Sequence, residues 1–320
     1  MATTDQENRQ DRGGEPPRAA AAADAHGVDG RQAPRVGLLG VGLMGSAMAR
    51  RMASQGIEVI AWDADPDHVA ALEQHGVRAS AAAGDVVSTA DVVITMLPTA
   101  EIVWTVIEPL LAQWPKRTIW LQMSSVGAAE ADDLAQAAAA HDVVCFDAPV
   151  SGSTRPAEEG RLTILVSGPE TARPSVDPIL AALGSRVQFV GEAGQGSRLK
   201  LAANHWMISM VAALAETMHL CELMGLDQQQ FVSLLDGGPL GSPYGLDKLA
   251  EMTRHEYPAG FPVRLAVKDL GLVREVADGA KVEMPVLAAA LERMHAAIPS
   301  HGDDDLAAVY ELGIGRRPAE

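Results

Sequence analysis

A lysine and an asparagine interrupt the longest apolar stretch of the chain, residues 199–224. Residues 194–197 (GQGS) are typical of a helix start, so Lys200 and Asn204 share one face of a helix that is otherwise largely apolar. Burying an ammonium group is costly unless it is paired or its pKa falls, and a lysine of lowered pKa can act as a general acid/base. Asn204 can then orient the lysine or a substrate. The alternative is that Lys200 extends to water and Asn204 caps a neighbouring group.

A glycine-rich turn provides a second candidate site. Gly40, Gly42 and Gly45 form the pattern G-x-G-x-x-G between a predicted strand at 35–39 and a predicted helix at 46–54. In this pattern the first glycine permits a tight turn, the second lets a pyrophosphate approach the backbone, and the third packs the helix against the strand. The turn therefore predicts dinucleotide binding, with Leu43 and Met44 among the contacts. A purely structural glycine turn between strand and helix is the alternative.

The acid expected about twenty residues after such a turn is Asp63, at the end of the second predicted strand. Its carboxylate can accept hydrogen bonds from the adenosine ribose and would repel a 2′-phosphate. Asp65 and Asp67 follow without an accompanying Lys or Arg. The sequence favours NAD over NADP as the cofactor. A role for Asp63 as a turn residue is the alternative, and capping is a strong competitor for Asp65.

Three short turns follow predicted strands, at the sheet edge where open α/β folds bind ligands. Their candidate residues are Leu97 and Pro98, Ser125, and Ser151, Gly152 and Ser153. The serine turns can offer hydroxyl and backbone N–H groups to a carboxylate, whereas Leu97 and Pro98 can border the nucleotide. A strand terminator explains Pro98 equally well, and serine and glycine are common in turns of any function.

The order of apolar runs predicts the elements that position these residues. Short β-branched runs alternate with alanine-rich helical patterns, which is typical of a parallel sheet covered on both faces. The expected strands are 35–39, 58–62, 91–97, 118–122, 142–147, 162–167 and 186–190. Beyond 190 the pattern is helical, broken by turns at 236–243 and 257–262. We therefore expect a sheet domain at 34–193 and an all-helical domain at 194–320.

Composition narrows the class of protein. A length of 320 residues suits two domains, and a net charge of −17 without a basic run argues against nucleic acid as a partner. Cys145 and Cys221 lie among apolar residues and read as core thiols of a reduced compartment. Residues 1–33 mix charges, Gly, Pro and Ala and predict a disordered tail without a secretion signal. With the apolar stretch too interrupted for a membrane span, a cytoplasmic location is expected.

Five motifs together resemble one family. GLLGVGLMG, MLP, DAPVSGS, GQGSRLKLAAN and VKDLGL occur in the order and spacing of the β-hydroxyacid dehydrogenases, the 3-hydroxyisobutyrate dehydrogenase family, across residues 35–300. The resemblance implies an N-terminal Rossmann-type α/β domain joined through a long interdomain helix to an all-α C-terminal domain that often dimerises. It also implies a small carboxylate substrate and a homodimer or homotetramer.

The same resemblance assigns roles to residues. It implies that Lys200 is the catalytic lysine, that Asn204 binds the substrate, and that Ser151, Gly152 and Ser153 match the turn that grips the substrate carboxylate. Ser125 matches a hydroxyl that contacts cofactor and substrate, and Lys268 a lysine beside the cofactor. The sequence departs from the usual pattern of the family at three places. Ser153 replaces a usual glycine, residues 154–156 (TRP) replace a small Gly/Ala run, and Ala203 replaces an asparagine.

These features lead to the hypothesis of reversible hydride transfer between nicotinamide and a short 3-hydroxyacid or its semialdehyde, without a metal. Two alternatives remain. An imine reductase would share the fold, but the resemblance implies Asp or Tyr in place of Lys200 and a preference for NADPH. A non-catalytic dinucleotide-binding module, with Arg155 and the altered turn at Ser153 marking a lost pocket, would keep the glycine turn but has no need of Lys200, Asn204 and Lys268 together.

Overall fold

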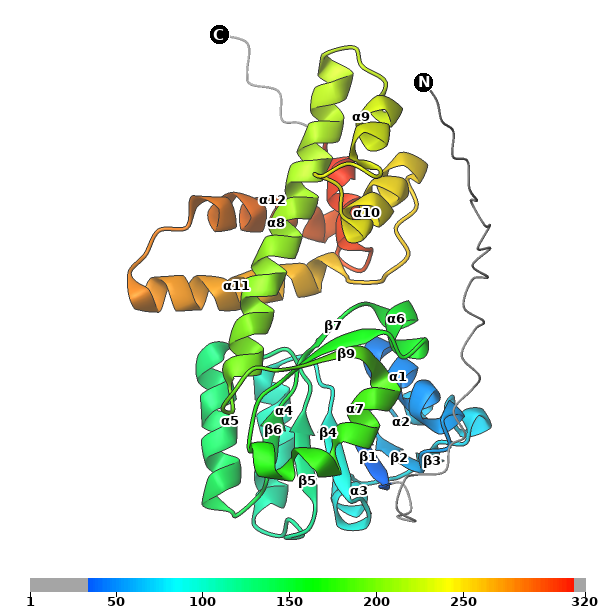
Figure 1. The fold of residues 1–320 in the computed structure, drawn as a ribbon, viewed down its shortest axis with the longest axis vertical. Coiled ribbons are helices and arrows are strands. Elements are labelled where there is room, and N and C mark those ends of the chain that lie inside the picture. Colours follow the sequence, from blue (N-terminus) through cyan, green and yellow to red (C-terminus); the bar gives the residue numbers. More distant parts are fainter. Residues whose placement is uncertain (1–33, 314–320) are drawn as a thin grey trace, which may run out of the picture. The chain divides into compact units, whose positions relative to one another are not determined.

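Six parallel strands form the main sheet of the computed structural model, which describes residues 34–313 (Figure 1). The strands run in the order β3-β2-β1-β4-β5-β6, the order of dinucleotide-binding Rossmann folds. In sequence the elements are β1 (Val36–Leu39), α1 (Leu43–Ser54), β2 (Val59–Trp62), α2 (Pro66–Ala70), a 3-10 turn (Glu73–His75), β3 (Arg78–Ala79), α3 (Ala83–Thr89), β4 (Val92–Thr95), α4 (Ala100–Leu111), β5 (Ile119–Gln122), α5 (Ala128–Ala140) and β6 (Cys145–Asp147). The tail predicted at 1–33 lies outside the described residues.

The sheet is covered on both faces, as the sequence predicts. Successive residues of a strand point to opposite faces, so Leu38 packs in a core with Met48 and Met52 of α1, while Leu39 packs in another with residues of α3, α4 and α5. Strands buried on both faces require continuous apolar runs, which β1 (VGLL) and β4 (VVIT) provide. Strand β3 was not predicted, because it has only two residues and both are exposed.

A second, smaller sheet follows the main one, and here the sequence prediction of a single parallel sheet is wrong. It contains β7 (Val150–Ser151), β8 (Leu162–Val166) and β9 (Gly184–Phe189), with α6 (Thr154–Glu158), a 3-10 turn (Glu170–Ser175) and α7 (Asp177–Leu183) between them. Only two residues separate β6 from β7, too few for the crossover that a parallel return to the main sheet requires. Strand β8 pairs antiparallel with β7, and β9 parallel with β8.

From residue 195 onward the described chain is helical, as predicted. Helix α8 (Gln195–Leu223) is followed by α9 (Gln228–Leu235), α10 (Pro243–Arg254), α11 (Val263–Ala280), α12 (Pro285–His301) and a 3-10 segment (Leu306–Leu312). Apolar residues of α8, α11 and α12 form the core of this region, and Figure 1 shows α8 passing alongside the other helices. None of the helices in residues 34–313 is long and apolar enough to cross a membrane.

Candidate active site

All fifteen site residues predicted from the sequence line one cleft of about 840 Å³. They come from the carboxyl ends of the main-sheet strands, from the first turn of α1, from β7 and the turn after it, and from helices α8 and α11. The set comprises Gly40, Gly42, Leu43, Met44, Gly45, Asp63, Leu97, Pro98, Ser125, Ser151, Gly152, Ser153, Lys200, Asn204 and Lys268. Residues that lie up to 228 positions apart in the chain, from Gly40 to Lys268, therefore meet in one place.

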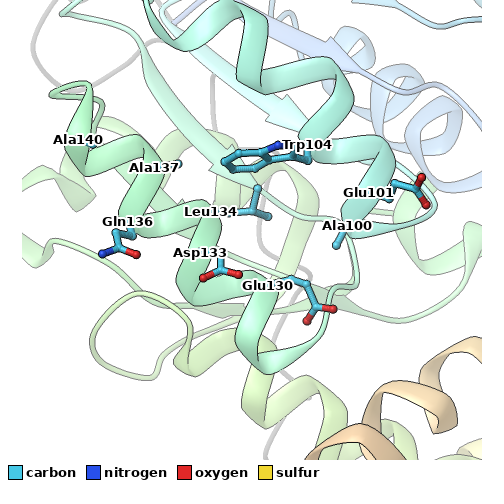
Figure 2. A pocket seen from close by; sticks show the side chains of 9 residues that line it. All are labelled: Ala100, Glu101, Trp104, Glu130, Asp133, Leu134, Gln136, Ala137 and Ala140. Atoms are coloured by element: carbon cyan, nitrogen blue, oxygen red, sulfur yellow. The ribbon is translucent and has the colours of Figure 1, made fainter.

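Another hollow, of about 740 Å³, lies between α4 and α5 (Figure 2). Figure 2 shows the ring of Trp104 near Leu134, with the carboxylates of Glu101, Glu130 and Asp133 around the opening. None of the predicted site residues lines this hollow. The candidate active site is therefore the cleft that contains Lys200.

The glycine turn leaves the start of α1 open to the cleft. Gly40 has a φ of 98°, and a Cβ added to it would collide with the carbonyl oxygen of Met96. A Cβ on Gly45 would collide with the carbonyl oxygen of Gly40, so α1 packs against β1 only with glycine at this position. A Cβ on Gly42, in contrast, would meet no atom within 4 Å. With no side chain capping α1, its free N–H groups and helix dipole fit a pyrophosphate.

The carboxylate of Asp63 joins the glycine turn to the end of β2. Its Oδ2 accepts a hydrogen bond from the backbone N–H of Val41 at 2.7 Å, and its Oδ1 accepts one from Asp65 N–H at 3.0 Å. Asp65 caps α2 by accepting from Asp67 N–H, as the sequence suggested. Asp63 thus holds a turn and also lines the cleft. His68 is the nearest basic side chain, with Nδ1 3.4 Å from Asp63 Oδ1.

Lys200 and Asn204 are both buried on one face of α8, with exposed fractions of 8% and 1%. Asn204 Nδ2 donates to Oδ2 of Asp269, which is itself buried on α11. The other carboxylate oxygen of Asp269 lies 3.0 Å from Lys268 Nζ, although no hydrogen bond of good geometry reaches it within the described residues. The carboxylate of Asp269 therefore links Asn204 to Lys268.

Burial lowers the pKa of Lys200 from 10.5 to about 8, because the ammonium loses hydration in the cleft wall. The negative charge of Asp269 raises this pKa and the positive charge of Lys268 lowers it, but desolvation has the largest effect. A pKa near 8 lets the amine exchange a proton near neutral pH. The alternative in which Lys200 extends to water is wrong, because its side chain is buried.

The first turn of α8 is held in place by a buried carboxylate, and this fixes the position of Lys200 one turn later. Asp147, 3% exposed at the end of β6, accepts hydrogen bonds from both the backbone N–H and the hydroxyl of Ser197, each at 2.7 Å. Ser167 Oγ donates to the same carboxylate and accepts from Gly196 N–H at 2.9 Å. Burial raises the pKa of Asp147, and the bonds from Ser197 and Ser167 oppose that rise.

The serine turn after β7 also lies at the cleft. Gly152 has a φ of 133°, a backbone conformation that favours glycine over residues with a side chain. Ser153 lines the cleft and precedes α6, but Arg155 does not line it. The Arg155 side chain is 83% exposed and pairs with Glu159 at 3.0 Å. Arg155 therefore does not mark a lost pocket.

Lys268 connects α11 to two turns of the main sheet. Its Nζ donates to the carbonyl oxygen of Ser125 at 2.8 Å and to that of Pro98 at 3.2 Å. The neighbouring Ser124 is fully buried, and its hydroxyl accepts from Leu97 N–H at 2.9 Å. Ser124 thus shapes the edge of the sheet, whereas Ser125 and Pro98 border the cleft.

Sequence reasoning did not assign a role to Asp269 or Asp147, although both lie in motifs that it singled out. Asp269 follows Lys268 in VKDLGL, and Asp147 begins DAPVSGS. An acidic residue inside an apolar run is the signal that could have found Asp269, since a buried carboxylate needs a partner. Their partners lie 65 and 50 residues away in the chain, so the pairing itself has no local signal.

Family models cover nearly all of the described chain. Residues 35–191 match the NAD binding domain of 6-phosphogluconate dehydrogenase, and residues 194–312 match the NAD-binding domain of NADP-dependent 3-hydroxyisobutyrate dehydrogenase. A 2-(hydroxymethyl)glutarate dehydrogenase of Eubacterium barkeri is 31% identical over 284 residues, which span 87% of this chain and 94% of the relative. The chain belongs to the β-hydroxyacid dehydrogenase family. The resemblance inferred from its motifs is confirmed, and this β-hydroxyacid dehydrogenase is an NAD(P)-dependent oxidoreductase that acts on CH–OH groups.

Solved structures agree with this assignment. A 3-hydroxyisobutyrate dehydrogenase of Mycobacterium tuberculosis, solved with L-serine, matches with a TM-score of 0.80 and 27% identity, covering 88% of this chain and 99% of that one. An imine reductase from Pseudomonas sp. matches with a TM-score of 0.58 and 20% identity, covering 88% and 99%. At that identity the second match shows a shared fold alone.

Proposed function

We propose that this β-hydroxyacid dehydrogenase uses NAD to oxidise a short 3-hydroxyacid to its semialdehyde, reversibly, with Lys200 as the general acid/base. The observation that supports this most directly is a buried lysine of lowered pKa in the same cleft as an open helix N-terminus and a serine turn. Bound nicotinamide supplies the acceptor or donor of the hydride. The residues of the chain hold the substrate and move the proton.

In the proposed oxidation, neutral Lys200 Nζ accepts the proton of the substrate hydroxyl group while a hydride leaves the carbon that bears this hydroxyl group. In the reverse direction the ammonium form returns that proton to the developing alkoxide. Asn204 is held by Asp269 through one of its amide N–H groups, so its amide is oriented before a substrate enters. Because the Asn204 amide is already oriented, less entropy is lost when the reacting carbon of the substrate is aligned.

The substrate carboxylate is assigned to the turn of Ser151, Gly152 and Ser153. This turn can present hydroxyl and backbone N–H groups to an anion, and it borders the cleft that contains Lys200. Substrates without a carboxylate would then lose alignment as well as affinity, because positioning contributes to the barrier itself.

The preference for NAD rests on Asp63. Its carboxylate lines the cleft and is fixed by Val41 N–H, and a 2′-phosphate placed beside it would meet its negative charge. The family model that matches residues 194–312 is described from an NADP-dependent enzyme. The proposed preference for NAD therefore rests on Asp63 of this chain and not on the family model.

The test is a nicotinamide-absorbance assay of the purified protein against short 3-hydroxyacids and semialdehydes, with NAD(H) and NADP(H) run in parallel. We expect turnover with NAD at least tenfold more efficient than with NADP, roughly the effect of one unfavourable charge contact of about 1.4 kcal/mol. If the enzyme turns over none of the acids or semialdehydes but still binds NADH, the proposal is refuted. Imines then become the next substrates to test. If imines are not reduced either, a non-catalytic dinucleotide-binding module is the remaining alternative.

Lys200→Ala provides the residue-level test. Turnover should fall by orders of magnitude while NADH binding is retained, since Lys200 is assigned to the proton and not to the dinucleotide. The matched control is Lys116→Ala, an exposed lysine between α4 and β5, which should leave both quantities unchanged. Near-wild-type turnover of Lys200→Ala would remove this lysine from the mechanism.

We also propose a homodimer or homotetramer formed through the helical region. Large apolar side chains are exposed on α8 and in the α8–α9 segment, including Leu223, Met224 and Leu234, and on α11 and α12, including Val276 and Val286. Such a surface is typical of an interface. Light scattering of the eluted protein should give a mass of at least twice 33.6 kDa, and a mass of one chain would refute this assignment.

A further inference from the structure

Apolar and aromatic side chains line much of the cleft on the side of the helical region, beside the polar residues Lys200, Asn204, Ser242, Arg264, Lys268 and Asp269. On α8, Ala203, Met207 and Met210 line it at spacings of four and three residues, and thus from one face of the helix. Tyr244 near the start of α10 and Phe261 in the loop before α11 line it as well. These five side chains form what we call the apolar wall.

Contacts place the apolar wall next to the serine turn. A Cβ on Gly260, which precedes Phe261, would lie 3.5 Å from Ser153 Cβ. Ser242 Oγ, at the start of α10, lies 3.7 Å from Met210 Sδ. A substrate whose carboxylate is held at Ser151–Ser153 and whose hydroxyl reaches Lys200 would therefore direct its remaining substituent toward this wall.

Apart from Lys200, the basic groups near the wall already have acidic partners. Lys248 lies 5.3 Å from the Tyr244 ring, but its ammonium is bound by Glu251 at 2.9 Å and by Asp305 at 2.8 Å. The Arg264 side chain, half exposed at the cleft, pairs with Asp303. Lys268 is paired with Asp269 and donates to two carbonyl oxygens. A second carboxylate on the substrate would therefore compete with the protein's own acids for a cation.

The size of the wall residues favours a substituent larger than methyl. Ala203, which lines the cleft, carries only a methyl group. The thioether side chains of Met207 and Met210 are flexible and adapt to apolar groups of different shape. Each further methylene buried against such a surface contributes about 0.8 kcal/mol, or roughly fourfold in kcat/KM.

We propose that the substrate is a 3-hydroxypropanoate with an apolar substituent larger than methyl on the carbon next to its carboxylate, and without a second acidic group. This inference rests on the proposed function. The reaction is the same: the carbinol carbon gives its hydride to nicotinamide, Lys200 takes the hydroxyl proton, and the C–O bond becomes the C=O bond of an aldehyde acid.

The experiment compares three acids with purified enzyme and NAD: 2-methyl-, 2-ethyl- and 2-benzyl-3-hydroxypropanoate, together with 2-(hydroxymethyl)glutarate as the dicarboxylate. We expect kcat/KM to rise about fourfold from methyl to ethyl, by the methylene increment above, and to be lowest for the dicarboxylate. A dicarboxylate that equals or exceeds the ethyl acid refutes this inference alone, as does a decrease from methyl to both larger groups. Turnover of none of the four refutes the proposed function as well.

A variant of the apolar wall provides the second measurement. Met207→Arg adds a guanidinium to the wall and should shift the ratio of kcat/KM toward the dicarboxylate by at least tenfold. The matched control is Ala213→Arg, which adds the same group on the exposed side of the same helix and should leave the ratio unchanged. Equal shifts in both variants would show that the effect comes from overall charge and would overturn the inference. If Met207→Arg does not fold, the comparison of acids with the unmodified enzyme still decides the question.

Discussion

Replacing Lys200 with methionine should make the protein more stable at neutral pH while abolishing turnover. The folded state lowers the pKa of this lysine from 10.5 to about 8. At about 1.36 kcal/mol for each pKa unit, holding the ammonium in the cleft at pH 7 costs roughly 3 kcal/mol relative to the unfolded chain. Methionine is unbranched and of similar length but carries no charge, so the variant should gain up to about 3 kcal/mol in the free energy of unfolding.

The pH dependence has a defined sign. Between pH 8 and 10.5 the unfolded chain binds one more proton at this position than the folded chain, so the stability of the wild type rises with pH across that window. The advantage of Lys200→Met should therefore shrink as pH increases, by about 2 kcal/mol between pH 7 and 9.5. Taking the difference between variant and wild type cancels the other groups that titrate.

Urea unfolding of both proteins without cofactor, at pH 7, 8.5 and 9.5, measures this difference. Lys116→Met is the matched control, since Lys116 is exposed and its replacement should give a small difference that does not vary with pH. A Lys200→Met protein that is less stable than wild type at pH 7 would refute a desolvation cost at this lysine. A stability gap that stays constant from pH 7 to 9.5 would also contradict it.

Three further outcomes follow from the site. The kcat/KM for oxidation should rise with pH through an apparent pKa of about 8, and Lys268→Met should move that pKa upward because the charge of Lys268 lowers it; a downward shift in the pH–rate profile contradicts this. Asp147→Asn should lower kcat at least tenfold, the effect of about 1.4 kcal/mol, because the carboxylate positions the first turn of α8. The affinity for NADH, measured by fluorescence titration, should not change. An unchanged kcat would show that Asp147 does not position Lys200. Gly45→Ala should weaken NADH binding more than tenfold, because its Cβ collides with the Gly40 carbonyl, and normal binding would show that the turn can shift.

Local sequence was sufficient for much of the fold. Runs such as VGLL and VVIT predicted the buried strands, since a strand covered on both faces is apolar at every position. The glycine spacing predicted the turn before α1, because steric collision excludes other residues there. The pairing of β8 and β9 in a second sheet was not predicted, because the partner of a strand depends on the length and direction of the connections and not on the apolar pattern of the strand itself.

For the active site, the sequence by itself determined which residues could take part. The spacing of Lys200 and Asn204 places them on one face of any helix that contains both, and the motifs identified fifteen of the residues that line the cleft. It left open whether Lys200 is buried or reaches water. That was decided by the packing of α8 against α11 and by the hydrogen bonds that Ser197 donates to Asp147, 50 residues earlier in the chain. Burial and the charges of Asp269 and Lys268 set the pKa of Lys200, because hydration and Coulomb energy depend on distances that exist only in the folded chain.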